Sequence, residues 1–395
     1  MLSALLEALE EELDAAVALR HRLHEHPELA HAERWTSQTV AAALAVTSEP
    51  VAGTGLLARV GGEGRAVAVR AELDGLPVRE ATGAPFSASG ETMHACGHDV
   101  HMAALVALTR AASRLDGDLP VPLLAIFQPS EEAYPSGAKL IAERIPALLD
   151  PLAVVGAHVH PELPWGAVAI DGGPVNASCD AIEIEIHGAA SHGAYPHLGR
   201  DPILALSETV LSLHAAVGRR IDPLHAATLT IGVLDAGSAE NVIPASARAR
   251  GALRAHSEAD RATLRELAGE VVAGVAAAHG CRGELRLTRG EPVLRNDEAI
   301  ATSARGLLAR AGLTPASEPW RSCGSDDFSF FGEGRPVAMA FVGLDGAPGF
   351  RSRPLHHPEL LPPDEAVGAV ARTQAAMYVA ATQTLRVTVE EDVGR

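Results

Sequence analysis

The chain is long enough for two domains and too acidic for a nucleic-acid-binding protein. It has 395 residues, of which 47% are hydrophobic and only 3% aromatic, so a large aliphatic core can form and two domains are expected. Acidic residues outnumber basic ones by 50 to 32, which gives a formal net charge of −18. Because nucleic acids and anionic membranes attract basic surfaces, this balance argues against both as partners.

Cysteine usage and the N-terminal segment bear on where the protein acts. The four cysteines lie far apart, at Cys96, Cys179, Cys281 and Cys323, which is not the pattern of a disulfide framework. The apolar start of the chain carries several glutamates and so lacks the basic start and uncharged core of a secretory signal. No segment approaches the roughly 20 uncharged apolar residues that span a membrane. We therefore expect a cytoplasmic protein.

Strand and helix patterns alternate in the first part of the chain. The predicted elements are, in order, a helix at 3–26, a strand at 66–73, a helix at 100–115 and strands at 121–127 and 152–157. Short apolar runs that alternate with helices are typical of a mostly parallel α/β sheet with helices on both faces. The chemistry of such sheets lies beyond the carboxyl ends of their strands.

After Pro174 the pattern becomes that of a second, smaller domain. Residues 181–187 alternate isoleucine with polar side chains, as in a half-exposed strand. The following elements are a helix at 201–217, strands at 227–234 and 245–253, a helix at 257–278 capped by Ser257, and a strand at 284–287. The order β-α-β-β-α-β is that of a ferredoxin-like domain. We predict a main domain from residues 1–177 and 290–395, interrupted by an inserted domain at 178–289.

Metal-ligating residue types gather just before the helix predicted at 100–115. Cys96 and His98 flank Gly97. Alternate residues of an extended segment point the same way, and glycine permits close backbone approach, so both side chains are predicted to reach one metal ion. A lone buried cysteine is usually inert. Here the neighbouring imidazoles favour ligation, because Cys, His and carboxylate side chains are the ligands of Zn²⁺ and similar metals.

An acidic pair, Glu131 and Glu132, follows the strand predicted at 121–127. Adjacent residues of a straight strand face opposite ways, so a loop is needed for both to enter one site. One carboxylate would bind the metal and the other would move a proton, since a carboxylate beside a metal-bound water can accept its proton and pass it to a leaving amine. The alternative is a solvated acidic loop, which is the usual state of an isolated glutamate pair.

Further candidate ligands follow later in the chain. His158 ends the apolar run of the strand predicted at 152–157, and one residue of the pair His356-His357 would close the coordination shell. Asp74 and Asp99 are candidates to orient a ligand imidazole by hydrogen bonding to its second nitrogen.

Three residues of the inserted domain have ordinary explanations when taken alone. His192 lies in a Gly- and Pro-rich stretch that reads as a surface loop, Asn241 precedes Val242-Ile243-Pro244 as a turn residue would, and Arg254 could be an exposed charge at a strand edge.

Taken together, the motifs resemble the dinuclear metallo-amidohydrolases related to aminoacylase, carboxypeptidase G and succinyl-diaminopimelate desuccinylase. Within these, the chain is most similar to the branch of hippurate hydrolase and indole-3-acetyl-amino-acid hydrolase. The motifs run nearly end to end: Arg22-Leu23-His24 with Pro27-Glu28-Leu29, Arg70-Ala71-Glu72-Leu73-Asp74, His94-Ala95-Cys96-Gly97-His98-Asp99, Pro129-Ser130-Glu131-Glu132, His192 with Pro196-His197, Asn241-Val242-Ile243-Pro244, Gly324-Ser325-Asp326-Asp327-Phe328 and Leu355-His356.

The resemblance implies a zinc-exopeptidase-like main domain and a set of residue roles. The implied ligands of two divalent ions (Zn, Mn, Co or Ni) are Cys96, bridging in place of the aspartate of related branches, with His98, Glu132, His158 and His356. Glu131 would be the general base and then the acid. His192 would stabilise the oxyanion in the site of a partner subunit, and Asn241 and Arg254 would hold the substrate carboxylate. The chain departs from the family's usual wording at Glu72, where Asp is usual, and at Asp326, where Glu is usual.

The function implied is hydrolysis of an N-acyl amino acid, a small-molecule substrate, by a metal-activated water. A dipeptidase or aminopeptidase on the same scaffold is the nearest alternative. A non-catalytic metal-binding protein would require a broken site, whereas Glu131 and the ligand set are intact. The resemblance also implies a homodimer formed through the inserted domain, for which an exposed edge strand would give a physical route.

Overall fold

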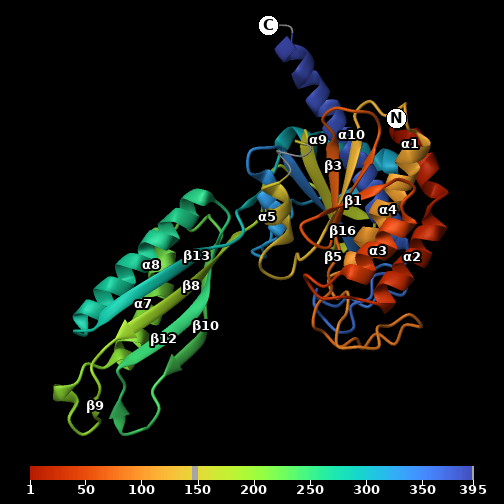
Figure 1. Cartoon of the computed structure of the whole chain (residues 1–395). Coiled ribbons are helices and arrows are strands. Elements are labelled where there is room, and N and C mark those ends of the chain that lie inside the picture. The colour runs from red at the N-terminus through yellow and green to blue at the C-terminus, as the bar shows by residue number, and fades with distance from the viewer. Residues whose placement is uncertain (145–149, 394–395) are drawn as a thin grey trace. The chain divides into compact units, whose positions relative to one another are not determined.

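A computed structural model gives the structure of the protein and describes residues 1–144 and 150–393. The chain forms two compact units (Figure 1). The main unit consists of Met1–Gly173, Arg295–Trp320 and Asp327–Arg395, and the inserted unit of Pro174–Leu294 with Arg321–Asp326. The insertion is thus slightly longer than the predicted 178–289, and it includes the short segment Arg321–Asp326 from the later part of the chain, which the sequence analysis did not place there.

The main unit is built on an eight-stranded sheet with the order β1-β2-β4-β3-β5-β16-β6-β15. The strands are β1 (Ser48–Val51), β2 (Gly55–Val60), β3 (Val67–Glu72), β4 (Leu123–Gln128), β5 (Ala153–Pro164), β6 (Ala167–Ala169), β15 (Thr314–Pro315) and β16 (Val337–Asp345). The central strands β4, β3, β5 and β16 are parallel, while β1, β2 and β6 pair antiparallel toward the edges. Every residue of β3 and β4 is buried, as strands covered on both faces require. The predicted mostly parallel sheet is confirmed.

Helices cover both faces of this sheet. They are α1 (Leu2–Glu10), α2 (Leu13–Glu25), α3 (Arg34–Ala43), α4 (His98–Arg114), α5 (Gly137–Ala142), α9 (Glu298–Leu307) and α10 (Glu365–Val393), with 3₁₀ turns η2 (Leu308–Ala311) and η3 (Asp327–Gly332). Apolar side chains of α1, α2, α4, α9 and α10 form one core with the sheet. On the other face Phe328 of η3 packs against Gly156 of β5. None of the helices described is long and apolar enough to cross a membrane.

The single helix predicted at 3–26 is wrong, because the segment forms α1 and α2 with a break at Glu11-Glu12. The two helices bury apolar stripes of their own. Glu12 is only 2% exposed, and its carboxylate pairs with Arg110 and Arg114 of α4. The break lets this carboxylate turn inward, a tertiary contact that helical periodicity does not reveal.

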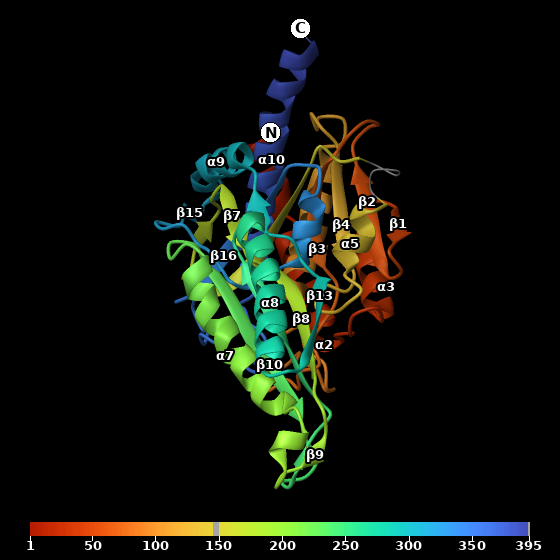
Figure 2. The ribbon, with the colours of Figure 1, turned by 90° about the vertical axis from the view of Figure 1, so that its left-hand side faces the viewer.

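The inserted unit is the predicted ferredoxin-like arrangement. Its four strands are β8 (Ser178–His187), β10 (Ala227–Ala236), β12 (Ser246–Ala255) and β13 (Arg282–Arg289), and its helices are α7 (Pro202–Arg220) and α8 (Glu258–Ala278). The antiparallel sheet has the order β10-β12-β8-β13. Figure 2 shows α7 and α8 side by side over one face. Ile182, Ile184 and Ile186 point into the core beneath them, and Ser257 caps α8 by accepting from the Asp260 N–H at 3.0 Å.

Short elements complete the fold. In the inserted unit β9 (Ser191–His192) and β11 (Val242–Ile243) form a two-stranded ribbon beside the 3₁₀ turn η1 (Pro196–Leu198). Where the chain enters and leaves the inserted unit, β7 (Gly173–Asn176) pairs with β14 (Leu294–Asn296).

Candidate metal centre

Three central strands bring the candidate residues of the main unit to one edge of the sheet. β3 and β4 end level with each other, with Glu72 opposite Gln128. β5 pairs with β3 as far as Gly156 and then continues, so that His158 lies within β5 near the level of Glu72. The prediction that His158 ends its strand is therefore wrong, although it still lies beyond the last pair with β3. The loops after β3 and β4 start from this same edge.

The turn before α4 differs from the predicted extended segment. Gly97 is the N-cap of α4 with φ +87°, in the left-handed region, and His98 is the first helical residue. A Cβ at Gly97 would lie 2.6 Å from Cγ2 of Val159. Glycine is therefore needed both for the backbone conformation and for close packing. The left-handed turn brings Cys96 and His98 together although they do not alternate along a strand.

Five side chains converge at this edge. Ligand-type atoms of Cys96, His98 and Glu132 lie within 4.8 Å of one another. The Cys96 Sγ is 3.5 Å from Nε2 of His158, and a Glu132 Oε1 is 3.2 Å from Nε2 of His356. We call these five residues the Cys96 cluster. The structure thus brings together all five residues that the resemblance implied as ligands. Their role as ligands remains a prediction.

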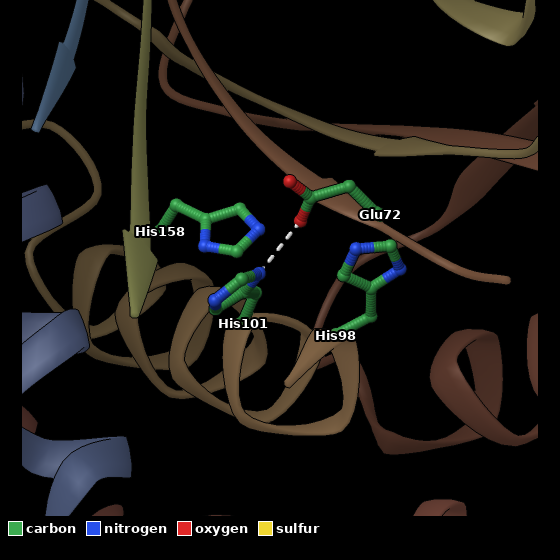
Figure 3. Close-up of side chains that lie close together, drawn as sticks. All are labelled: Glu72, His98, His101 and His158. Atoms are coloured by element: carbon green, nitrogen blue, oxygen red, sulfur yellow. Dashed lines mark hydrogen bonds and ion pairs between the residues drawn. The ribbon is translucent and has the colours of Figure 1, made fainter. Parts of the chain in front are cut away.

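A second group overlaps the first and includes two residues that the sequence analysis did not single out as site residues. Glu72, His98, His101 and His158 also offer atoms within 4.8 Å of one another (Figure 3). His101 donates from Nδ1 to a Glu72 carboxylate oxygen at 2.9 Å, and its Nε2 accepts from the Val159 N–H at 3.0 Å. Both ring nitrogens of His101 thus form hydrogen bonds within the protein, so His101 would stabilise the residues around the site rather than bind metal. The i, i+3 spacing of His98 and His101 on one helix was the available signal.

Hydrogen bonds leave the nitrogens of the two remaining histidines directed at the cluster. His98 donates from Nδ1 to the main-chain carbonyl of Asp74 at 2.8 Å, and its buried Nε2 has no hydrogen-bond partner among the described residues. His158 donates from Nδ1 to the carbonyl of Val159 at 2.7 Å, which leaves Nε2 facing Cys96. A Glu132 oxygen is likewise buried without a hydrogen bond from the described part of the chain.

These unsatisfied atoms are the test of whether the residues fit a metal. Burying a polar atom without a partner costs about 1–3 kcal/mol, so two such atoms in one place, His98 Nε2 and a Glu132 oxygen, need an explanation. Beside them the Cys96 thiol and His158 Nε2 are hydrogen-bonded to each other at 3.5 Å. Imidazole, carboxylate and thiol together are the ligand types of zinc and related ions. The donor set therefore fits bound divalent cations.

The pKa shifts at the site also favour a bound cation. Burial raises the pKa of the Cys96 thiol well above its usual value, and the carboxylates of Glu132 and Glu131 raise it further. Burial lowers the pKa of His98, but contact with Asp74 and the charge of Glu72 outweigh it and raise this pKa to about 10. Without a cation the cluster would hold a neutral thiol and a protonated imidazole. A divalent cation would reverse both preferences.

Asp74 and Asp99 were both predicted to orient a ligand imidazole. Asp74 holds His98 through its main-chain carbonyl, with its carboxylate 3.6 Å away, and its Oδ2 accepts from the Glu132 N–H at 2.9 Å. Asp99 instead accepts from Arg20 Nε at 2.9 Å and His24 Nδ1 at 3.0 Å, so the prediction for Asp99 is wrong. One residue along a helix is a rotation of about 100°, which turns Asp99 away from the side of α4 that carries His98.

The structure places the three predicted residues of the inserted unit at two ends of that unit. His192 of β9 pairs with Val242 of β11, and the carbonyl of Asn241 accepts from the Gly193 N–H at 2.7 Å. Arg254 lies near the far end of β12, where its Nη1 donates to the carbonyl of Cys323 at 3.0 Å.

β12 begins at Ser246, three residues after β11. From there to Arg254 the strand extends roughly 26 Å at about 3.3 Å per residue. Within one chain Asn241 and Arg254 therefore cannot hold the same carboxylate, contrary to the simplest form of that prediction.

Comparison with known proteins identifies the family. The model described as peptidase family M20/M25/M40 matches residues 68–378. The chain belongs to this family. An N-acetyl-L-cysteine deacetylase of Bacillus subtilis (strain 168) is 34% identical over 361 residues, covering 89% of this chain and 84% of that protein. An N-acetyldiaminopimelate deacetylase of Bacillus licheniformis is 32% identical over 375 residues, covering 93% of this chain and 98% of the relative.

Solved structures of family M20 proteins and their relatives share the fold. A putative aminohydrolase from methicillin-resistant Staphylococcus aureus superposes with a TM-score of 0.90 at 27% identity, covering 96% of this chain and 99% of the other. A Bacillus subtilis protein described as a dinuclear metal binding peptidase from the M20 family gives a TM-score of 0.83 at 29% identity, with coverages of 95% and 99%.

Proposed function

We propose that the protein is a metal-dependent amidohydrolase that cleaves the amide bond of N-acyl amino acids. The observation that carries this proposal is the convergence of the Cys96 cluster, with its unsatisfied ligand-type atoms, beside Glu131. Family membership and relatives named as deacetylases of N-acetylcysteine and N-acetyldiaminopimelate support the same reaction.

In this proposal the residues of the Cys96 cluster would hold two divalent metal ions, with Cys96 as a ligand available to both. When bound, the ions would polarise the amide carbonyl and lower the pKa of an attacking water. A thiolate ligand favours Zn²⁺, and the imidazoles and carboxylates also suit Mn²⁺, Co²⁺ and Ni²⁺. Asp74 would keep His98 and Glu132 in position through the hydrogen bonds described above.

Glu131 would carry the proton. Its Oε2 is 3.9 Å from Nε2 of His98, and its side chain is 14% exposed, so it lies at the margin of the cluster and within reach of water. An amine is a poor leaving group unless it is protonated. A carboxylate in this position can accept a proton from water and then deliver it to the leaving nitrogen.

The inserted unit would supply contacts to the substrate through a homodimer. Because Asn241 and Arg254 are far apart in one chain, the proposal assigns His192 and Asn241 to the site of the partner subunit and Arg254 to the substrate carboxylate. Most exposed large apolar side chains belong to this unit, including Leu204 and Leu211 of α7 and Leu234 of β10, which are 59%, 72% and 61% exposed. β10 is an edge strand of its sheet, which suits pairing with a second copy.

Two more specific versions of the proposal differ in the acyl group of the substrate. The sequence motifs favour the hippurate and indole-3-acetyl-amino-acid hydrolase branch, whereas the relatives reported above are named for N-acetyl substrates. Both versions share an amide between an acyl group and an amino acid. All four cysteines are free thiols, which fits the cytoplasmic setting that we keep as part of the proposal.

The test combines elemental analysis of the purified protein with a hydrolysis panel of N-acetyl, N-benzoyl and indole-3-acetyl amino acids. Dipeptides with a free amino terminus complete the panel, and preference for them would favour the dipeptidase alternative. Glu131→Gln should abolish turnover while the metal content stays at the wild-type value. The matched control is Glu91→Gln, since the Glu91 side chain is 81% exposed. Full turnover by the Glu131 variant would refute its role.

A further inference from the structure

The turn that delivers Glu131 and Glu132 has an unusual backbone. Ser130 follows the end of β4 by two residues and has φ +50°. A residue other than glycine in the left-handed region costs about 1–2 kcal/mol and persists only where surrounding contacts enforce it. Ser130 belongs to the motif Pro129-Ser130-Glu131-Glu132, yet the proposed chemistry gives it no task.

A buried carboxylate holds this turn. The Ser130 N–H donates to Oε1 of Glu33 at 2.8 Å, and Glu33 is fully buried at 0% exposure. The other carboxylate oxygen accepts from the hydroxyl of Thr54 at 2.6 Å. The Ser130 hydroxyl lies 2.9 Å from Nε2 of His31 and donates to the Ala133 carbonyl at 2.8 Å. A hydrogen bond to a buried charged group is among the stronger contacts in a protein.

The position of Glu33 in its own helix shows that this contact is not incidental. Glu33 is the N-cap residue of α3, but its side chain makes no capping hydrogen bond there. The side chains that usually cap a helix start are those of Ser, Thr, Asp and Asn. In α3 the Thr36 N–H donates to Oε2 of Glu28 at 2.8 Å, so the Glu33 carboxylate is not needed there. Here it reaches across the chain to Ser130 instead.

A second carboxylate fixes the other side of Glu131. The Glu132 N–H donates to Oδ2 of Asp74 at 2.9 Å. The N–H groups of the residues on either side of Glu131 are therefore each held by a buried acid from a distant segment. Adjacent side chains of a straight strand diverge, whereas this turn lets Glu131 and Glu132 both approach His98.

We propose that Glu33 is a positioning residue whose carboxylate holds Ser130 in the left-handed conformation and so aims Glu131 and Glu132 into the metal centre. The statement about Glu131 rests on the proposed function, because it takes Glu131 as the proton carrier. The conformation of the turn and the binding of metal by Glu132 do not depend on Glu131 being the proton carrier.

The test compares Glu33→Ala and the more conservative Glu33→Gln with Thr54→Val. The last variant removes the other partner of the Glu33 carboxylate and leaves the Ser130 contact in place. Misplacing a catalytic group by about 1 Å costs up to about 100-fold in rate, so we expect kcat to fall at least about tenfold in Glu33→Ala with KM little changed. The kcat of Glu33→Gln should lie between those of Glu33→Ala and the wild type, and the kcat of Thr54→Val should be near the wild-type value.

Rescue separates positioning from general stability. Glycine enters the left-handed region at little cost, so adding Ser130→Gly to either Glu33 variant should restore part of the lost kcat. A purely structural role for Glu33 would lower the melting temperature without such recovery, and kcat per bound metal would remain that of the wild type.

Two readouts do not use turnover. Hydrogen exchange of the amides at 129–133 should quicken in the Glu33 variants and not in Thr54→Val, and loss of Zn²⁺ to a chelator should speed up in the same variants. Unchanged exchange and unchanged metal release in both Glu33 variants would overturn the proposal. If the wild-type protein hydrolyses no acyl amino acid, the proposed function fails, while these two readouts still decide the role of Glu33.

Discussion

At the scale of single residues, a buried charge network lies behind the candidate site. Asp99 pairs with Arg20 and His24, and His24 also contacts Glu80 at 3.1 Å. Arg20 continues to the carbonyl of Pro362 at 2.6 Å. The network therefore ties α2 to the start of α4 and to the chain segment that follows His356.

His24 gives this network a pH dependence. Burial lowers its pKa, but the charges and hydrogen bonds of Asp99 and Glu80 outweigh burial and raise the pKa from 6.5 to about 9. The stabilisation by protonated His24 is complete below pH 6.5 and is lost as the pH rises through 9. A shift of this size corresponds to at most about 3 kcal/mol.

We therefore expect His24→Gln to lower the free energy of unfolding at pH 6 by roughly 1–3 kcal/mol and by much less at pH 9.5. Denaturant unfolding of wild type and variant at both pH values measures this difference. His26→Gln, at an exposed position, should show no such pH dependence. A His24→Gln deficit that is equal at both pH values would contradict the assignment.

The resemblance to a known family was needed to predict Cys96, His98, Glu132, His158 and His356 as a group, because ligand types alone left open which residue of each Glu and His pair would bind metal. The residues behind them were harder to predict. Asp99 was assigned to the wrong partner, and Glu33 and Arg20 were not singled out. Their partners lie far away in sequence, and a buried ion pair leaves no local periodicity or motif that marks it.

At the scale of elements, the start of α4 depends on one glycine. Gly97 has φ +87°, and a Cβ there would lie 2.6 Å from Val159. Gly53 has a similar φ of +91° but nothing within 4 Å of the added Cβ. Alanine at either position would therefore have an unfavourable positive φ. Only at Gly97 would the added methyl group also clash with a side chain of β5.

Gly97→Ala should therefore destabilise the protein by more than Gly53→Ala, which should cost about 1–2 kcal/mol. We also expect Gly97→Ala to lose metal, because the turn sets the positions of Cys96 and His98. Denaturant unfolding and elemental analysis of both variants measure these effects. Equal losses in the two variants, with full metal content in Gly97→Ala, would show that close packing at this turn is unimportant.

Elements with a regular burial pattern, either buried throughout as in β3 or on one face as in α8, were predicted well from the sequence. The strand predicted at 66–73 is β3 (Val67–Glu72), and the helix predicted at 257–278 is α8 (Glu258–Ala278). The break between α1 and α2 was missed because it depends on Glu12 meeting two arginines of α4. The turn at Gly97 was read as extended because alternating ligands fit a strand equally well.

At the scale of the whole molecule, the proposal assigns residues of the inserted unit to the site of a partner subunit. Asn241 and His192 lie at one end of the inserted unit and Arg254 near the other, as the strand register requires. A twofold dimer in which each inserted unit serves the partner would make two complete sites from two incomplete ones. Exposed apolar side chains of α7 and β10 give that dimer a surface to bury.

Complementation between inactive subunits tests this arrangement. Glu131→Gln and His192→Ala should each be inactive or strongly impaired as homodimers. A heterodimer of the two, purified through two different tags, contains one site with an intact Glu131 and an intact His192 from its partner. We therefore expect it to recover about half of the wild-type activity per dimer, because one of its two sites is complete.

The control heterodimer joins Glu131→Gln to His98→Ala. Both changes fall in the main unit, and each would disable the site of its own chain. No combination of these two subunits contains a complete site, so this heterodimer should stay inactive. Activity in the control would show that one of its two variants is not inactive, whereas absence of recovery when His192→Ala is paired with Glu131→Gln would mean that His192 serves the site of its own chain. In that case the inserted unit would have to reach its own metal centre, and the dimer would not be needed for catalysis.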